Sequence, residues 1–372
     1  MSLDDEIKER KNEIHTDGYS MSIGELISLY RDGEIDIHPE FQRFFRWSPL
    51  QKTKLIESIL LGIPVPPIFV SQNEEGVWDV IDGMQRLSTI YEFVGELRDE
   101  DNKKLPASQL LRTEYLPSLD GKLWSDRRNQ HEAFTKTQQL DFKRSKLDIR
   151  IIKKESSKST KYELFQRLNT LGTQLSDQEI RNCLLVMENR DFYWWLKDLA
   201  ETPSFSSCMP LSSRQMEQQY DLELALRFLV LKNTEIEGLK GIQDIGEFLT
   251  KRMLEFVGDK GFNKAKEKDS FVKTFDILNS ALGDDCFRRF DAVTNRFLGG
   301  FLISAFEVIA VGVGTHYATW ARSDLKERNE ELAKRVRAVW GEAEFQKYSG
   351  SGVRASSRIP VLVPLGKTLF KK

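Results

Sequence analysis

Apolar residues in the first half of the chain follow two alternating spacings. Helical spacing occurs in three stretches, residues 21–33, 48–62 and 84–94. Extended apolar runs occur in three others, residues 64–72, 77–82 and 147–152. Gly33 and Gly62 stand where helices commonly end, and Ser48 followed by Pro49 is typical of a helix start. These patterns predict a mixed α/β domain.

The second half of the chain is helical in pattern almost to its end. Ser176 and Glu179 have the spacing of a capping box, which predicts that a helix starts there. The charged, serine-rich residues 153–160 mark the change of pattern. We therefore expect an α+β protein in which an α/β domain at residues 1–157 precedes an all-helical domain at residues 158–372.

The overall composition limits the partners and the location of the protein. The chain has 55 Lys plus Arg and 57 Asp plus Glu, so any contact with nucleic acid has to come from local patches. Three widely separated cysteines and a charged N-terminus without an apolar segment predict a reduced, cytoplasmic protein. The longest apolar stretch contains Glu307 and His316, which favours a buried helix with a satisfied core histidine over a membrane span.

The segment VIDGMQRLST, residues 80–89, leads from a predicted strand through an Asp-Gly turn into a predicted helix. Such a turn gathers backbone N–H groups and the positive end of the helix dipole at one point, which favours anion binding. Arg86 in the first helical turn opposes the dipole unless an anion such as phosphate lies between them. Gln85 can add an amide donor or orient a water molecule beside the phosphate.

Asp82 at the start of this turn has two interpretations. It either caps the following helix, which is the commoner role of Asp at such a position, or it holds a metal ion or polarises a water molecule. Glu57, on the preceding predicted helix, is the nearest carboxylate that can join Asp82 at a metal. A solvated helix residue is the simpler interpretation of Glu57.

A second group of polar residues lies in PEFQRFFRW, residues 39–47. In an extended segment Gln42 and Arg46 share one face, and Arg43 lies on the other. Arginines among aromatic residues suit phosphate or base recognition, by paired hydrogen bonds and by stacking. Surface arginines packed on their aromatic neighbours are the alternative.

Four segments, in this order, resemble the N-terminal domain of the GmrSD family of modification-dependent restriction enzymes. They are PEFQRFFRW, LIESILLGIPVPPIFV, VIDGMQRLSTIYEF and FQRLNTLGTQLSDQEIRN, which together span roughly residues 20–190. The resemblance implies a ParB/sulfiredoxin-like fold for the first domain. It also implies a nucleotide-binding, often nucleotide-hydrolysing module of anti-phage defence.

In that family an Asp-Gly-x-Gln-Arg element is tied to nucleotide binding and hydrolysis. The matching positions here are Asp82, Gly83, Gln85 and Arg86. The other motif positions are Phe41, Gln42, Arg43, Arg167, Asn169, Gly172 and Glu179. The family usually has Gln where Met84 stands, and a thioether cannot donate a hydrogen bond. Nucleotide binding is therefore a firmer expectation than hydrolysis.

The resemblance implies an NTP with Mg²⁺, bound in a pocket where the two domains meet. The expected nucleotide-binding residues are Gln42, Arg43, Arg46, Gly83, Arg86 and Asn169. Gln85 is expected to orient the attacking water, with Asp82 and Arg86 beside it at the reacting phosphate. Asp82, together with Glu57, is expected to hold Mg²⁺, and Glu179 approaches from the helical domain.

The sequence lacks the signs of a nuclease. An HNH-type nuclease needs histidines as base and metal ligand. The four histidines, none in an Asp-His pair, are His15, His38, His131 and His316. No Walker loop is present either. We therefore expect nuclease activity to come from a separate effector chain.

Local basic stretches offer a route to DNA. Residues 143–154 hold six basic residues against one acidic residue, and residues 334–337 read KRVR. Such stretches can follow a DNA backbone without reading its sequence. A solvated strand edge guarded by lysines is the alternative.

Two other functions remain open from the sequence. One is a non-catalytic DNA-binding or regulatory module that uses nucleotide as a conformational signal, and Met84 favours it. The other is direct cleavage of DNA by this chain. Direct cleavage ranks last because no metal-binding cluster is visible in the sequence.

Overall fold

The computed structural model describes residues 2–5, 16–37, 47–73, 75–99, 101–125, 131–153 and 176–372. The chain divides into two compact units, unit 1 at residues 1–175 and unit 2 at residues 176–372. The boundary expected at residue 157 lies outside the described residues. In the described part of the chain, every helix is too short or too polar to cross a membrane.

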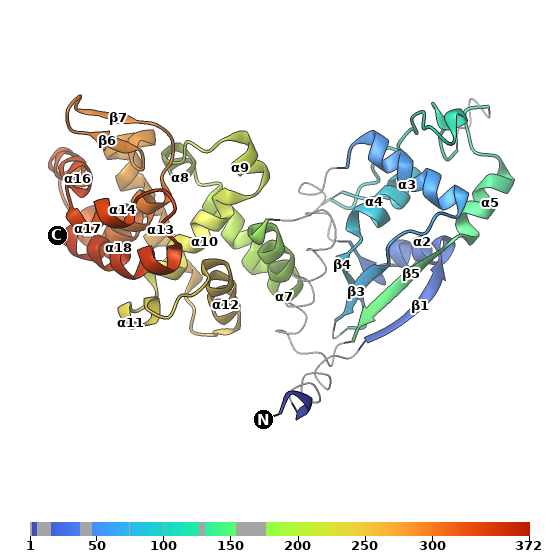
Figure 1. Ribbon diagram of the computed structural model, residues 1–372, viewed down its shortest axis with the longest axis horizontal. Coiled ribbons are helices and arrows are strands. Elements are labelled where there is room, and N and C mark those ends of the chain that lie inside the picture. Colours follow the sequence, from blue (N-terminus) through green and yellow to red (C-terminus); the bar gives the residue numbers. More distant parts are fainter. Residues whose placement is uncertain are drawn as a thin grey trace. The chain divides into compact units, whose positions relative to one another are not determined.

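The centre of unit 1 is a five-stranded sheet in the order β1-β5-β3-β4-β2 (Figure 1). The strands are β1 (Thr16–Ser22), β2 (Ile35–Asp36), β3 (Ile68–Gln72), β4 (Trp78–Asp82) and β5 (Lys146–Ile152). β3 lies between β5, to which it is parallel, and β4, to which it is antiparallel. The prolines at residues 64–67 precede β3, because proline cannot donate to the ladder of a central strand.

Helices cover one side of this sheet (Figure 1). They are α2 (Ile23–Asp32), α3 (Pro49–Leu61), α4 (Met84–Phe93) and α5 (Lys136–Arg144), with a short 3-10 helix η2 (Pro117–Leu119). The predicted ends are confirmed: Gly33 and Gly62 are left-handed C-caps with φ of 78° and 70°. Ser48 forms a reciprocal capping box with Gln51 at the start of α3.

Unit 2 is mostly helical. Its helices are α7 (Asp177–Ala200), α8 (Pro203–Cys208), α9 (Ser213–Glu217), α10 (Tyr220–Lys232), α11 (Ile236–Leu239), α12 (Ile245–Gly258), α13 (Lys264–Leu282), η3 (Gly283–Asp285), α14 (Ile303–Thr315), α15 (Tyr317–Ala321), α16 (Leu325–Val339), α17 (Ala343–Tyr348) and α18 (Ala355–Leu369). With the sheet of unit 1, this arrangement confirms the α+β class. The capping box of Ser176 and Glu179 starts α7 as predicted.

The prediction that the second domain is all-helical is wrong at one place. A β-hairpin of β6 (Arg289–Asp291) and β7 (Arg296–Leu298) interrupts the helices. Its turn is stabilised by the Asp291 carboxylate, which accepts hydrogen bonds from the Val293 backbone N–H and the Thr294 hydroxyl. Two three-residue strands are too short to give a clear alternation in the sequence.

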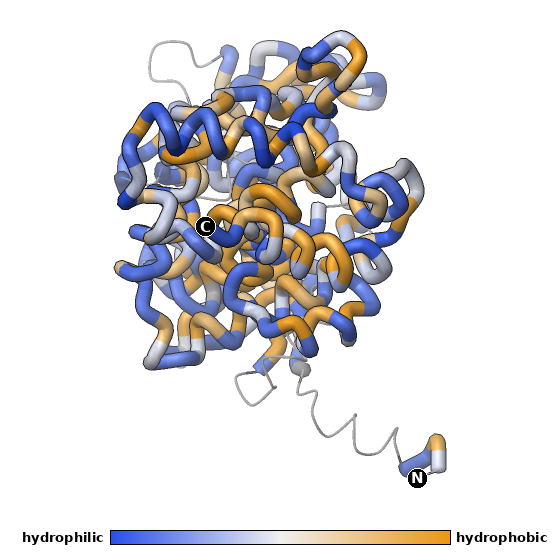
Figure 2. Tube along the Cα trace, turned by 90° about the vertical axis from the view of Figure 1, so that its left-hand side faces the viewer, coloured by the Kyte–Doolittle hydropathy of each residue, from blue (hydrophilic) through white to orange (hydrophobic). Residues whose placement is uncertain are grey.

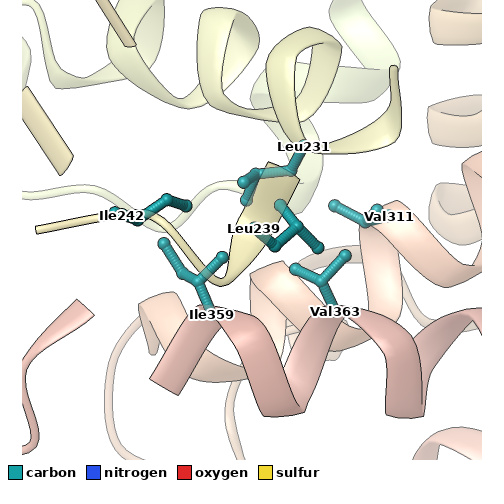
Figure 3. Packing of buried hydrophobic residues seen from close by; sticks show 6 residues of the cluster. All are labelled: Leu231, Leu239, Ile242, Val311, Ile359 and Val363. Carbon is teal, nitrogen blue, oxygen red and sulfur yellow. The ribbon is translucent and has the colours of Figure 1, made fainter. Parts of the chain in front are cut away.

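The core of unit 2 is apolar, and Figure 2 shows hydrophobic segments gathered toward the middle of this unit. One part of the core joins α10, the α11 region, α14 and α18 (Figure 3). Its buried members are Leu231, Leu239, Ile242, Val311, Ile359 and Val363. α14 and α18 approach closely where Gly312 faces Gly366, because a Cβ on Gly312 would lie 2.5 Å from the Gly366 carbonyl oxygen.

A chain of buried ion pairs crosses this core. Glu223 binds Arg181 at 2.6 Å and Arg227 at 2.8 Å. Arg227 also binds Glu307 at 2.8 Å, and Glu307 binds Arg358 at 2.7 Å. The Glu307 side chain is fully buried, so these arginines compensate its charge within the apolar helix α14.

The buried-helix prediction for the apolar stretch is confirmed, since most residues of α14 are buried. His316 follows α14 and its Nε2 lies 2.9 Å from the Lys367 carbonyl oxygen, so this histidine is hydrogen-bonded, although only half-buried. The three cysteines, Cys183, Cys208 and Cys286, are all buried in unit 2. The sulfur atoms of Cys208 and Cys286 lie 3.8 Å apart inside the core.

Candidate functional site

The candidate site is the turn between β4 and α4. Gly83 joins them with φ of 95°, a backbone conformation that side chains with a Cβ rarely adopt. A Cβ at this position would also lie 2.3 Å from Cδ1 of Ile68 on β3. The positive φ and the contact with Ile68 thus both favour glycine at this turn.

Arg86 lies one helical turn later and is buried, with 8% of its surface exposed. Its Nη1 donates to the Pro66 carbonyl oxygen at 2.6 Å, and its Nη2 donates to the Asp82 carboxylate at 2.8 Å. The anion that faces Arg86 in the described part of the chain is therefore the carboxylate of Asp82. Through these two hydrogen bonds the guanidinium connects the end of β4 with the loop that leads into β3.

The interpretation of Asp82 as a helix cap is wrong. The N-cap of α4 is Gly83, and this helix has no side-chain cap in the described part of the chain. The Asp82 carboxylate is held by Arg86 instead of by the first N–H groups of the helix. The first N–H groups of α4, at the positive end of the helix dipole, therefore have no side-chain acceptor among the described residues.

Gln85 connects this turn to the region of the second predicted cluster. Its side-chain oxygen accepts a hydrogen bond from the Trp47 backbone N–H at 3.3 Å. Trp47 directly follows the segment that contains Gln42, Arg43 and Arg46, which lies outside the described residues. No pattern in the sequence predicts this hydrogen bond, because 38 residues separate its two partners.

Glu57 is not the solvated helix residue of the simpler interpretation. It is buried, with 6% of its surface exposed. Its carboxylate accepts hydrogen bonds from the Thr113 hydroxyl and, at 2.9 Å, from the Leu116 backbone N–H. Glu57 thus anchors the loop that crosses α3, and its role as a metal ligand with Asp82 stays a prediction.

The described residues contain no group of three or more His, Cys, Asp or Glu side chains placed to hold a metal ion. In unit 1, Met84 is buried with 5% exposed, which makes it a packing residue.

In unit 2, Glu179 accepts a hydrogen bond from the Ser176 backbone N–H at 2.6 Å. Burial raises the pKa of Glu179, and Ser176 partly opposes this shift. Asn169 lies outside the described residues.

Comparison with protein families gives one match. Residues 23–186 match the family described as GmrSD restriction endonuclease, N-terminal domain. This stretch therefore belongs to that family, which indicates that the protein is a component of a restriction system. The match contains the whole turn from Asp82 to Arg86 and reaches into α7 of unit 2. Comparisons with curated proteins and with solved structures gave no match.

Proposed function

We propose that this protein binds a nucleoside triphosphate with Mg²⁺ at the Gly83 turn and hydrolyses it in a restriction system that acts on DNA with a separate nuclease. The observation that carries the proposal is the start of α4. There a strand ends in a glycine whose positive φ and close contact with Ile68 disfavour any side chain, and the helix has no side-chain cap among the described residues. Both features favour a phosphate at the helix N-terminus. A ParB/sulfiredoxin-like fold for unit 1 is part of this proposal.

In this proposal the phosphates are held mainly by backbone N–H groups at the start of α4. Arg86 positions them indirectly, because its guanidinium already binds Asp82 and the Pro66 carbonyl oxygen. Gln85 presents its amide N–H₂ group to a phosphate, since its oxygen accepts from Trp47. Additional charge compensation comes from Arg43 and Arg46, whose segment ends at that tryptophan.

The metal ion completes the proposed site. Asp82 is the candidate ligand of Mg²⁺, because 43% of its side chain is exposed although one oxygen binds Arg86. Glu57 fits this role less well, because a loop covers its carboxylate. Asn169 and Glu179 remain candidates for contacts to nucleotide through the family motif they belong to.

A nucleotide-switched DNA-binding module without turnover is the second candidate function. The pairing of Asp82 with Arg86 favours it, since it partly neutralises the carboxylate that hydrolysis needs for the metal. In this case the nucleotide binds at the same turn and changes the affinity of the protein for DNA or for its effector.

A binding titration combined with phosphate release tests the two functions. Purified protein is titrated with ATP, GTP, CTP and UTP in the presence of Mg²⁺, and phosphate release is followed on the same samples. Saturable binding with slow turnover supports the hydrolase, and binding without turnover supports the switch. Arg86→Ala is expected to lose binding in both cases, and unchanged affinity in this variant would contradict the assignment of the site.

A further inference from the structure

Strand β1 lies at one edge of the sheet of unit 1, with β5 as its neighbour (Figure 1). Its seven residues pair with β5 in a continuous register. The strand at the opposite edge, β2, has only two residues. In the part of the chain that the structure describes, no strand pairs with the outer side of β1. This outer side is therefore a long hydrogen-bonding edge that is open to another strand.

The composition of β1 does not protect this edge. Long edge strands in soluble proteins commonly carry Lys or Pro, or contain a bulge, which discourages pairing with a further strand. The sequence of β1, TDGYSMS, contains neither Lys nor Pro, and its pairing with β5 shows no bulge. Residues 17–20 are exposed, and Oδ2 of their only charged side chain, Asp17, lies 3.5 Å from Nζ of Lys153. The strand is thus suited to pairing with another strand.

The direction of the backbone groups follows from one hydrogen bond at the end of β1. The Ile23 N–H donates to the Ser145 carbonyl oxygen at 2.9 Å, next to the opposite pair of Ser22 and Lys146. In an antiparallel ladder every second pair of opposite residues is hydrogen-bonded. Counted back from Ile23, the odd-numbered residues of β1 therefore direct their N–H and C=O groups toward β5, and the even-numbered residues direct theirs outward. The even-numbered residues are Thr16, Gly18, Ser20 and Ser22.

A second copy of β1 matches this edge. If the two strands run antiparallel with a two-fold axis at Tyr19, all residues of each strand are paired. Gly18 then lies opposite Ser20 of the second copy, and the first residue of each strand lies opposite the last, so every outward backbone group has a partner. This register gives about eight main-chain hydrogen bonds. Asp17 lies opposite Met21 of the second copy, so no like charges face each other.

The side chains at this edge are complementary in the same register. Arg150 pairs with Gly18, and its side chain lies over this glycine, since a Cβ there would be 2.9 Å from its Cδ and 3.0 Å from its Nη1. Ser20 donates its hydroxyl hydrogen to Asp148, and a hydroxyl oxygen can still accept a hydrogen bond. With Gly18 opposite Ser20 of the second copy, the Arg150 guanidinium is placed to donate to that serine. The two-fold axis repeats the contact, so the same edge supplies both donor and acceptor.

We propose that the protein forms a two-fold dimer in which two β1 strands pair and join the two sheets into one continuous sheet. A second copy fits this edge because it supplies both the backbone partners and the side-chain contact. One short strand on each side is much less than a permanent interface contains, so we expect a dimer that dissociates on dilution. β5 and β3 separate β1 from β4, the strand that leads to Gly83. The inference therefore does not depend on nucleotide binding.

The test measures sedimentation velocity of the full-length protein between roughly 1 and 100 µM, where a dimer with so small an interface should form. Ser20→Pro removes an outward N–H but leaves the ladder with β5 intact, because an edge strand tolerates proline where its nitrogen faces away from the neighbouring strand. This variant should stay monomeric where the wild type dimerises. Ser20→Ala keeps the N–H and loses the hydroxyl, so its dimer should be roughly tenfold weaker. A monomeric wild type, or a Ser20→Pro dimer as stable as that of the wild type, would overturn the proposal.

Disulfide cross-linking locates the two-fold axis independently. Tyr19→Cys places two thiols opposite each other on the axis, where oxidised glutathione should cross-link them. Asp17→Cys is the matched control, because its thiol lies opposite Met21 and should stay uncross-linked, and the native cysteines are buried. Equal cross-linking of the two variants would overturn the proposed pairing. Thermal unfolding and the NTP titration are repeated on Ser20→Pro, and unchanged values exclude loss of the fold or of the nucleotide site as the cause of its monomeric state.

Discussion

The Arg86 guanidinium binds the Asp82 carboxylate at 2.8 Å across one turn at the start of α4. The two charged residues of the turn thus neutralise each other before any ligand binds. Only 10% of the Arg86 side chain is exposed, while 43% of the Asp82 side chain is. Loss of this ion pair would therefore leave an uncompensated charge on the buried Arg86. Asp82, in contrast, remains accessible to solvent and to a ligand.

Asp82→Asn is expected to destabilise unit 1 by about 1–2 kcal/mol, because it leaves the buried Arg86 without a carboxylate. Solvent around the partly exposed Asp82 keeps this loss below that of a fully buried pair. The free energy of unfolding in urea measures the effect. Arg86→Lys serves as a comparison, since a lysine cannot reach both Asp82 and the Pro66 carbonyl oxygen, and it should lose a similar amount. Wild-type stability in both variants would show that the pair has no structural role.

Gly83→Ala is expected to lower the free energy of unfolding by more than the strain of its backbone conformation alone would. Gly33→Ala is the matched control, because Gly33 also has positive φ but no atom lies within 4 Å of an added Cβ. The control should lose about 1–2 kcal/mol from strain alone. Gly83→Ala should lose clearly more, because the new Cβ meets Cδ1 of Ile68.

The same clash can be removed selectively. Valine lacks the Cδ1 atom, so the double variant Gly83→Ala, Ile68→Val should lose less stability than the sum of the two single variants. Urea unfolding of the wild type, the two single variants and the double variant gives the coupling free energy between positions 68 and 83. Simple additivity of the two losses is incompatible with the contact between positions 68 and 83.

The ion pairs in unit 2 should make its stability depend on pH. Burial raises the pKa of Glu223, but Arg227 and Arg181 outweigh burial and hold it below its ordinary value of 4.5. A carboxyl group with a lowered pKa stabilises the folded state above its unfolded-state pKa. This stabilisation is lost as the pH falls from about 4.5 through the folded-state pKa of Glu223.

Glu223→Gln tests this contribution. At neutral pH the variant should be less stable by about 3–5 kcal/mol, because Arg181 and Arg227 lose their shared carboxylate inside the core. Its unfolding free energy should also fall less steeply than that of the wild type between about pH 5 and pH 3. If the unfolding free energies of the wild type and Glu223→Gln changed in parallel with pH, this explanation would be contradicted.

Gly312→Ala is expected to weaken the packing of α14 against α18. The added methyl group meets the Gly366 carbonyl oxygen at 2.5 Å, and backbone atoms cannot move aside as a flexible side chain can. A loss of about 1–3 kcal/mol is expected in urea unfolding. Gly258→Ala in α12 has open space around it and should be neutral or slightly stabilising. Similar effects of the two substitutions would argue against close contact of these helices.

Much of the fold could be predicted because its signals are local. Gly33, Gly62 and the capping boxes at Ser48 and Ser176 fix helix ends through neighbouring residues. Apolar periodicity fixes helices and longer strands in the same way. The hairpin of β6 and β7 was missed because each strand has only three residues.

The partners at the candidate site were harder to predict. The spacing of Asp82 and Arg86 is that of an i, i+4 ion pair, a signal that the sequence contained and that the cap interpretation overlooked. The burial of Glu57 and the contact of Gln85 with Trp47 depend on segments far apart in the chain. Gln42, Arg43, Arg46 and Asn169 lie outside the described residues, so their roles stay predictions.

The most direct test of the central claim is a calorimetric titration of the wild type and of Gly83→Ala with nucleoside triphosphates and Mg²⁺, under conditions where both are folded. We predict saturable binding of at least one NTP to the wild type and at least tenfold weaker binding to the variant, roughly 1.4 kcal/mol. Gly33→Ala should bind as the wild type does. Equal affinity of the wild type and Gly83→Ala, or no binding of any NTP to the wild type, would contradict a phosphate site at the start of α4.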